Sequence, residues 1–300
     1  MHRAPLRLLV AINPAASFGR NRAVGSRVAE RLMAEGYEIS MLREANFELL
    51  RREAESALAL GADGMVVVGG DGMVSLGVNL LAGSGVPLGI VATGTGNDFA
   101  RGLGLPHADP GAATEALVAA LRRPTRLVDV GTIRHGGAQT MFACVVSTGF
   151  DAVVNERANR MTRPRGASRY TLAMVRELAT FRARRYVITI DGVRREQRAM
   201  LVSVANSPSL GGGMRIVPQA DLADGLLDVF IVHPLSRWRL IGVFPKVFAG
   251  RHTDHPAVEF LTAREVRIEA DDIVAYADGE RIGRLPIDIG IAPGALSVFA

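Results

Sequence analysis

The sequence predicts an α/β protein with two domains: a doubly wound, mostly parallel sheet first, and a mostly β, sandwich-like domain second. The length of 300 residues is about twice that of a typical domain. Apolar runs alternate with helix-like segments over residues 6–123, which is typical of a doubly wound sheet. From residue 126 onward, strand-like segments follow one another without regular helices. We therefore expect an α/β domain over 1–128, which 287–300 is a candidate to join, and a β-rich domain over 129–286.

The first half of the chain shows clear helical and strand periodicities. Val24, Val28 and Leu32 have the spacing of one buried helix face within residues 20–36, and Gly36 ends that segment. The run MVVV has the length and β-branching of a strand buried in a parallel sheet. The predicted strands are 6–12, 37–42, 65–68 and 87–92, and the predicted helices are 20–36, 47–60, a segment after 72, and 111–123.

The second half of the chain is rich in strand-like segments. These segments are 126–134, 139–148, 185–191, 194–205, 226–232 and 264–270. Two helical stretches, 151–183 and 235–250, interrupt them. The final strand-like run, ALSVFA, could return to either domain.

Composition excludes several classes of protein. Hydrophobic residues make up 48% and charged residues 22%, as in a folded globular protein. The single cysteine, Cys144, excludes an intrachain disulfide and a multi-cysteine metal site. Lys246 is the only lysine, so neither a P-loop nor the lysine motif of protein kinases is present. No apolar stretch approaches the ~18–20 residues of a membrane span, and we expect a cytoplasmic protein.

The charge balance favours anionic partners. The formal net charge is +5, and the isoelectric point is about 10.1. Because the positive charge is almost all arginine, genome composition explains it as well as function does, and no nucleic-acid partner is inferred. Phosphates and acidic lipid headgroups are the partners that such a surface attracts.

Two glycine-rich turns follow buried strands: GGDG at 69–72 and TGTGND at 93–98. Glycine lets a backbone approach a phosphate closely and present its N–H groups, and a following helix N-terminus adds positive charge. Asn13, after the first strand, is a third candidate phosphate contact. Asp71 and Asp98 indicate Mg²⁺ or a hydroxyl partner, because a carboxylate repels phosphate. The alternative is a pair of ordinary tight turns with capping side chains.

These motifs resemble those of the diacylglycerol kinase-type lipid kinase family. The resemblance rests on GGDG and ATGTGNDFAR, on STGFDA at 147–152, on the stretch 205–229 with its GGG and DGLLDV, and on ADGE at 277–280. It covers nearly the whole chain. It implies an ATP-dependent lipid kinase that transfers the γ-phosphoryl group to a hydroxyl of a lipid such as diacylglycerol. The first domain would then bind the nucleotide and the second the lipid, with the active site in the cleft between the domains.

The resemblance also implies roles for particular residues. Asp278 or Glu280 would accept the hydroxyl proton, although ADGE also fits a plain β-turn. A second Mg²⁺ would be held by the Asp224 side chain and by carbonyls of Asp221 and Leu226, where an Asp-Gly turn is the alternative. Asp129 would belong to a Mg²⁺–water network or would cap a turn. The implied nucleotide contacts are Gly69, Gly70, Asp71, Gly72, Gly94, Thr95 and Asn97.

The sequence departs from the family pattern directly after GGDG. Met73-Val74-Ser75-Leu76 stand where the family carries threonine, a hydrophobe, asparagine and glutamate. The glycines, Thr95, Asn97 and ADGE remain, so we expect an active kinase with altered nucleotide contacts. The alternatives are an NAD kinase-like phosphotransferase, which shares GGDG, and a non-catalytic protein that binds a nucleotide or a lipid.

Two segments suggest how a lipid is reached. Residues 235–250 combine aromatic and apolar side chains with Arg237, Arg239 and Lys246, as at a bilayer interface. Nine arginines lie within 157–185. These segments predict a transient contact with an anionic membrane surface; core packing and a solvated helix are the alternatives. The oligomeric state is left open, with a dimer among the options.

Overall fold

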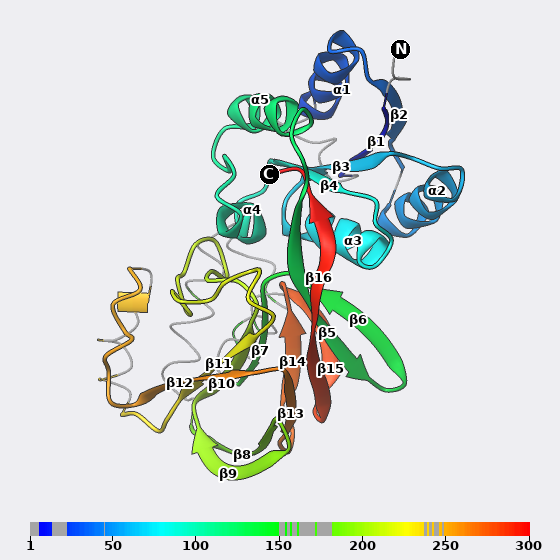
Figure 1. The fold of residues 1–300 in the computed structure, drawn as a ribbon. Helices are drawn as coiled ribbons and strands as arrows, with labels where there is room; N and C mark the ends of the chain where they lie inside the picture. The colour runs from blue at the N-terminus through cyan, green and yellow to red at the C-terminus, as the bar shows by residue number, and fades with distance from the viewer. Residues whose placement is uncertain are drawn as a thin grey trace. The chain divides into compact units, whose positions relative to one another are not determined.

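The computed structural model divides the chain into two compact units, Met1–Val130 with Pro293–Ala300, and Gly131–Ala292 (Figure 1). It describes residues 6–13, 23–44, 46–149, 182–236 and 249–300, and the single residues 154, 157, 161, 172, 239, 242, 246 and 247. Most of the helix predicted over 151–183 and half of the one predicted over 235–250 therefore lie outside the described residues. Two strands, β5 (Arg126–His135) and β16 (Ile287–Val298), run from one unit into the other.

The first unit is built on a parallel sheet of order β2-β1-β3-β4. These strands are β1 (Arg7–Ile12), β2 (Glu38–Leu42), β3 (Gly64–Gly69) and β4 (Leu88–Ala92). Every residue of β3 and β4 is buried, as expected for strands covered on both faces. The last residues of β16 join the sheet, where Val298 pairs with Leu88. The predicted doubly wound, mostly parallel sheet is confirmed.

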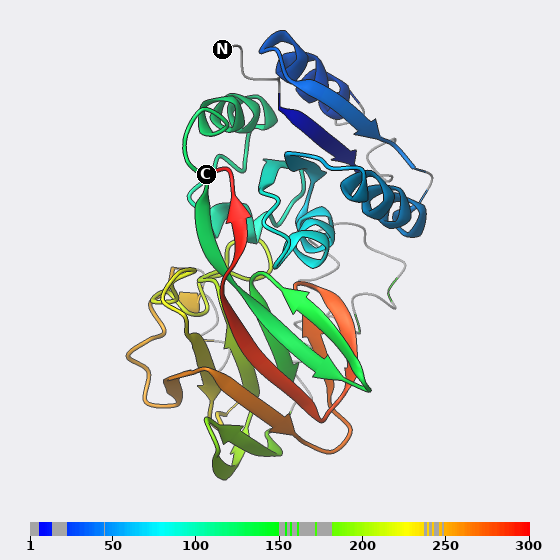
Figure 2. The ribbon, with the colours of Figure 1, turned by 45° about the vertical axis from the view of Figure 1, so that its right-hand side comes forward.

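Helices cover both faces of this sheet (Figures 1 and 2). On one face, α1 (Val24–Ala34) and α5 (Pro110–Ala120) share a core with the side chains of β1 and β3 that point toward them. On the other face lie α2 (Phe47–Ala59) and α3 (Asp71–Leu81). The predicted face of α1 is the buried one, because Val24, Val28 and Leu32 are at most 4% exposed.

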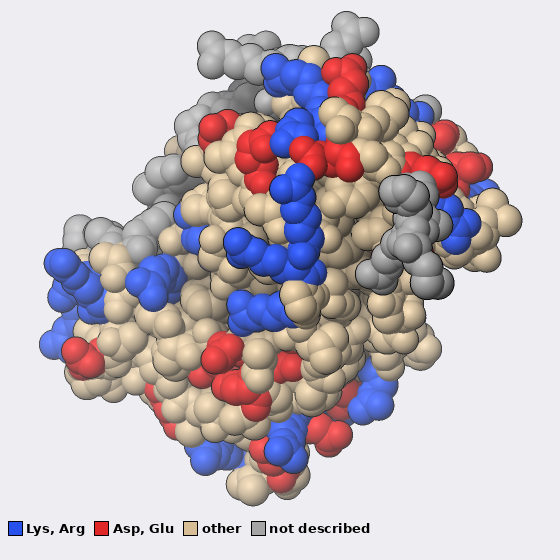
Figure 3. All heavy atoms as spheres, turned by 45° about the horizontal axis from the view of Figure 1, so that its top comes forward, with Lys and Arg blue, Asp and Glu red and all other residues tan. Residues whose placement is uncertain are grey.

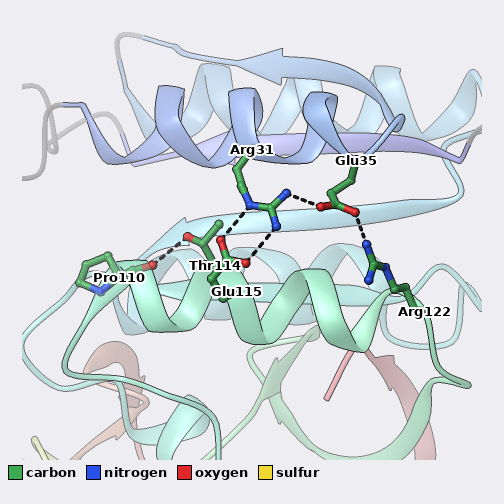
Figure 4. A network of polar contacts seen from close by, with 6 residues as sticks. All are labelled: Arg31, Glu35, Pro110, Thr114, Glu115 and Arg122. Atoms are coloured by element: carbon green, nitrogen blue, oxygen red, sulfur yellow. Dashed lines mark hydrogen bonds and ion pairs between the residues drawn. The ribbon is translucent and has the colours of Figure 1, made fainter.

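Charged side chains join α1 to α5 at the surface (Figure 4). Arg31 donates from Nε and Nη2 to the two carboxylate oxygens of Glu115, at 2.8 and 3.0 Å. Glu35 accepts hydrogen bonds from Arg31 and Arg122, which lower the pKa of its carboxyl group. Exposed ion pairs typically contribute about 0–1 kcal/mol. The buried contact between the helices therefore does most to hold them together.

The second unit is a sandwich of two antiparallel sheets around one apolar core. One sheet contains the unit's parts of β5 and β16 together with β6 (Ala138–Phe142), β8 (Arg184–Ile190), β9 (Val193–Ala199) and β13 (Glu265–Glu269). The other has the order β12-β11-β10-β7-β14-β15, made of β7 (Val145–Gly149), β10 (Leu201–Ala205), β11 (Leu227–Val232), β12 (Val258–Ala263), β14 (Val274–Ala277) and β15 (Glu280–Arg284). The predicted β-rich, sandwich-like domain is confirmed.

Two single strands predicted from the sequence are each two strands in the structure. The segment 139–148 breaks after Phe142, and β6 and β7 belong to different sheets. The segment 194–205 breaks at Met200, and β9 and β10 also belong to different sheets. Neither break contains glycine or proline: the first falls within the apolar run MFACVV, and the second falls just after the polar run RREQR gives way to apolar residues. Strands β12, β14 and β15 and the short helix α4 (Asp98–Gly102) were not predicted either.

Candidate active site

The strand order places the glycine-rich turns where doubly wound sheets bind ligands. The chain passes from β1 to β2 on one side and from β3 to β4 on the other, so the order reverses between β1 and β3. Asn13 follows β1 and donates its backbone N–H to the carbonyl of Val68 at 3.1 Å. A Cβ atom at residue 69 would lie 3.4 Å from the Cβ of Asn13. Asn13 therefore borders the first glycine-rich turn, as its predicted phosphate contact requires.

The two glycine-rich turns touch through their backbones. A Cβ atom at residue 94 would lie 2.5 Å from the Cα of Gly70, and a Cβ atom at residue 70 would lie 3.0 Å from the Cα of Gly94. The N–H of Thr93 donates to the carbonyl of Gly69 at 2.8 Å. Gly94 and Thr95 are exposed. The structure thus brings residues 69–72 and 94–95 together as one backbone surface, and only glycine permits that approach.

Asp71 joins the two turns with its carboxylate. Its Oδ2 accepts the backbone N–H of Asn97 at 3.0 Å, and its Oδ1 accepts that of Asp98 at 2.8 Å. Hydrogen bonds to an ionised acceptor are stronger than neutral ones. Asp71 therefore fixes the position of the second turn relative to the first. The sequence does not indicate this role, because the bonded groups are 26 and 27 residues apart.

Asn97 stabilises the backbone of the second glycine-rich turn. It adopts a left-handed backbone conformation with φ of 55°, which asparagine tolerates better than most residues. Its Oδ1 accepts the N–H of Gly94 at 3.1 Å, and its Nδ2 donates to the carbonyls of Gly94 and His107 at 2.9 and 2.8 Å. The side chain is 4% exposed. Asn97 therefore holds the turn's backbone in the form that a phosphate would meet.

The carboxylates of Asp71 and Asp98 lie close to one another, and their role as Mg²⁺ ligands stays a prediction. A Cβ atom at residue 96 would lie 2.2 Å from Oδ2 of Asp71 and 3.6 Å from Oδ2 of Asp98, so both oxygens border the same point. Mg²⁺ beside a nucleotide is usually held by one or two carboxylates together with phosphate oxygens and water. Within the described part of the chain, no group of three or more His, Cys, Asp or Glu side chains could hold a metal ion. Phosphate and water would therefore complete the coordination.

Asp129 joins two strands of the first unit. It is 3% exposed, and its Oδ1 accepts the backbone N–H of Gly294 at 2.7 Å. This bond holds β5 beside β16 at the end of the chain. Asp129 lies within β5 rather than at its end, so it does not cap a turn. Its part in a Mg²⁺–water network stays a prediction.

The residues that depart from the family pattern lie partly in the core. Met73 is 0% and Leu76 is 6% exposed, on the buried side of α3. A Cβ atom at residue 69 would lie 2.3 Å from Cγ of Met73, so this methionine packs over the glycine-rich turn. Ser75 is half-buried, and its carbonyl accepts a hydrogen bond from Asn79 at 2.9 Å. The two apolar departures thus change the packing next to the turn.

In the second unit, Asp278 and Gly279 form the two-residue turn between β14 and β15. Both have positive φ, 48° and 86°, as a type I′ hairpin turn requires. The Asp278 carboxylate accepts three backbone N–H groups, from Ala143 at 2.6 Å, Cys144 at 2.9 Å and Val145 at 3.0 Å. Glu280 begins β15 and is exposed. Of the two candidate carboxylates, one is fixed by the backbone and the other faces solvent.

The candidate second Mg²⁺ site is a pair of local turns. Oδ1 of Asp221 accepts the N–H of Ala223 at 3.0 Å, and Oδ1 of Asp224 accepts the N–H of Leu226 at 2.9 Å. Both aspartates are exposed. Burial, with a contribution from the charge of Asp224, raises the pKa of the nearby Asp228 to about 6, against the opposing effect of its hydrogen bond from Gln219. The second Mg²⁺ stays a prediction.

We expect substitution Gly94→Ala to weaken ATP binding at least tenfold. The new methyl group would have to push the second turn away from Gly70, and overpacking of this kind typically costs about 1–3 kcal/mol. Titration calorimetry with ATP measures the affinity. Gly111→Ala, at an exposed position of α5, is the matched control and should bind ATP normally. Unchanged affinity in Gly94→Ala would show that the contact between the turns does not matter for binding.

We expect the second unit to lose stability below about pH 6.5 through His252. This side chain is 1% exposed, donates from Nε2 to the carbonyl of Ile216 at 2.8 Å, and has its pKa lowered by burial. As pH falls through the ordinary histidine pKa, the unfolded chain takes up a proton that the folded one does not, so unfolding is favoured. Thermal melts between pH 5 and 7.5 should show a steeper decline for the wild type than for His252→Gln, which cannot titrate. Parallel curves would contradict this assignment.

Comparison with known proteins decides the family. The model of the diacylglycerol kinase catalytic domain matches residues 7–133, and that of the YegS C-terminal NAD kinase beta sandwich-like domain matches residues 144–300. A diacylglycerol kinase of Mycobacterium tuberculosis is 37% identical over 289 residues, covering 96% of this chain and 93% of that protein. The chain belongs to the diacylglycerol kinase and YegS-like lipid kinase family. The resemblance seen in the sequence motifs is thereby confirmed.

Other members of this lipid kinase family match over nearly the same length. The probable lipid kinase YegS-like protein of Chromohalobacter salexigens is 30% identical over 94% of this chain and 86% of its own. A crystal structure of a diacylglycerol kinase from Bacillus anthracis superposes with a TM-score of 0.72 at 23% identity, covering 98% of this chain and 96% of that one. The structural match shows a shared fold.

The residues expected to meet a membrane lie mostly outside the described part of the chain. They are the arginines of 157–185 and the aromatic residues of 235–250. On the face drawn in Figure 3, basic and acidic side chains form small groups among wide uncharged areas. No helix within the described residues is both long enough and apolar enough to cross a bilayer. Contact with an anionic membrane stays a prediction.

Proposed function

We propose that this chain is an ATP-dependent lipid kinase that phosphorylates a hydroxyl group of diacylglycerol. The oxygen of that hydroxyl forms a bond to the γ-phosphorus, the bond between this phosphorus and the β–γ bridging oxygen breaks, and ADP leaves. The proton of the hydroxyl passes to a carboxylate and then to water. The observation that carries the proposal is the joined pair of glycine-rich turns at the switch point of the sheet, in a chain that belongs to the lipid kinase family.

The first unit supplies the nucleotide site in this proposal. Asp71 and Gly72 open the 11-residue helix α3, whose first N–H groups have no partner within the helix and carry about half a positive charge. They can bind phosphate without the lysine that P-loop proteins use. Asp71 and Asp98 would hold Mg²⁺, which neutralises phosphate charge when bound. Asn97 keeps the second turn in its binding form through its three hydrogen bonds.

The second unit supplies the carboxylate that receives the hydroxyl proton, and the geometry favours Asp278. Phosphoryl transfer has a loose transition state, so catalysis depends mainly on positioning the reactants. Three backbone N–H groups at 2.6–3.0 Å fix the Asp278 carboxylate, whereas Glu280 is exposed. A carboxylate held in this way is positioned to receive a proton from the acceptor hydroxyl. The prediction that the active site lies between the two domains stays a prediction.

A substrate panel with labelled ATP tests the proposed function. The protein is incubated with Mg²⁺, γ-labelled ATP and mixed micelles of diacylglycerol, phosphatidylglycerol or sphingosine, with NAD as a soluble acceptor in parallel. We expect label in the product from diacylglycerol. Label in NADP alone would favour an NAD kinase-like enzyme. ATP binding in calorimetry without transfer to any acceptor would favour a non-catalytic protein, and an absence of ATP binding would contradict both readings.

A further inference from the structure

We propose that Asn206 is a positioning residue for the reaction: it orients the Asp278 carboxylate through two peptide groups of the 143–145 segment. Asn206 directly follows β10, and Asp278 directly follows β14. In the sheet, β7 lies between these two strands and begins at Val145. The two polar side chains thus flank the start of one strand from opposite sides. The inference rests on the proposed function of Asp278.

The first peptide group joins Ala143 to Cys144. Its carbonyl oxygen accepts a hydrogen bond from Nδ2 of Asn206 at 2.9 Å. Its N–H, on Cys144, donates to Oδ1 of Asp278 at 2.9 Å. A donor at the carbonyl end draws electron density away from the N–H end, which makes that N–H a stronger donor. The side-chain amide of Asn206 therefore strengthens the hydrogen bond that the N–H of Cys144 donates to Asp278.

The second peptide group joins Cys144 to Val145 and repeats the arrangement. Its carbonyl accepts the backbone N–H groups of Asn206 at 2.8 Å and of Ser207 at 3.2 Å. Its N–H, on Val145, donates to Oδ1 of Asp278 at 3.0 Å. Oδ1 of Asp278 thus accepts hydrogen bonds from two peptide groups. The carbonyl oxygen of each of these peptide groups accepts a hydrogen bond from residues that follow β10.

Burial makes these bonds effective and keeps water from replacing them. Ala143 and Asn206 are each 1% exposed, Cys144 is 4% exposed and Val145 is 0% exposed. Hydrogen bonds are stronger in such a low-dielectric interior, and a missing partner is costly. The single cysteine, whose side chain is buried, contributes its backbone here. Asn206 does not need to touch the substrate in order to affect the step that Asp278 performs.

The test compares the isosteric substitution Asn206→Asp with Asn206→Ala. The aspartate keeps the volume but has no N–H to donate to the Ala143 carbonyl, so we expect it to be the more damaging. We expect kcat for diacylglycerol phosphorylation to fall 10- to 100-fold, while KM for ATP changes less than twofold. The acidic limb of kcat against pH should move to higher pH, because weaker donors stabilise the Asp278 anion less. A purely structural defect would lower the amount of active protein without moving that limb.

The controls separate this inference from the proposed function. Ser203→Ala removes a buried hydroxyl on the same strand, away from the 143–145 segment, and should keep wild-type kcat. If Asn206→Asp does not fold, kcat and its pH profile are measured for Asn206→Ser instead, which introduces no charge. Full activity in Asp278→Asn would contradict the proposed function of Asp278. Loss of activity in Asp278→Asn with wild-type kcat and pH profile in the folded Asn206 variants would overturn this inference alone.

Discussion

Substitution Asp278→Asn is expected to lower kcat at least 100-fold and to leave the affinity for ATP within twofold of wild type. A positioned proton acceptor typically contributes about 10²–10⁴-fold to a rate. The amide also cannot accept all three N–H groups of residues 143–145, because its NH₂ end would face one of them. Steady-state kinetics with diacylglycerol give kcat, and calorimetry gives the ATP affinity. The two effects should separate because, in the proposed function, the first unit binds the nucleotide.

Glu280→Gln is the matched control for Asp278→Asn. Glu280 lies two residues away, carries the same charge and is exposed. Its variant should keep kcat within about fivefold, because an exposed side chain typically contributes little to a fixed geometry. A large loss in Glu280→Gln together with an active Asp278→Asn would reverse the assignment of the two carboxylates. Thermal melts of both variants show whether the hairpin turn between β14 and β15 still forms.

The first unit was largely predictable because its signals are local. A buried strand, a glycine-rich turn and a helix with apolar periodicity follow one another in the chain, and each occupies fewer than about 15 residues. These signals located the turns at 69–72 and 93–98. They could not show that Asp71 bonds the second turn. That bond depends on how β3 and β4 pair, which brings together residues far apart in sequence.

The second unit was less predictable because the chain can pass from one sheet of a sandwich to the other without a local signal in the sequence. The run MFACVV is apolar throughout, yet the chain leaves one sheet after Phe142 and enters the other at Val145. The break is stabilised by the Asp278 carboxylate, which takes up the N–H groups of residues 143–145. Asn206 was missed for the same reason: its partner lies 63 residues away. The ADGE motif therefore indicated the candidate carboxylate, but no local motif indicated the groups that hold it.

Substitution Asp71→Asn is expected to raise the dissociation constant for ATP at least 30-fold. The asparagine keeps the volume, but its NH₂ end cannot accept the second of the two N–H groups that Asp71 binds. Hydrogen bonds to a charged group typically contribute about 1.5–3 kcal/mol. Without one of them, the second turn is released from the first, and the backbone N–H groups no longer converge on one phosphate chain. Calorimetry with ATP measures the loss.

A comparison of ATP binding with Mg²⁺ and with EDTA distinguishes the two roles of Asp71. If Asp71 acts by joining the turns, its substitution weakens binding in both conditions. If it acts only as a Mg²⁺ ligand, the variant and the wild type bind equally well in EDTA. Asp63→Asn is the matched control, because Asp63 is an aspartate of the same unit that pairs with Arg7 at the surface. Equal binding in EDTA would contradict the joining role, and the backbone contacts between the turns, such as the bond from Thr93 to Gly69, would then be enough to hold them together.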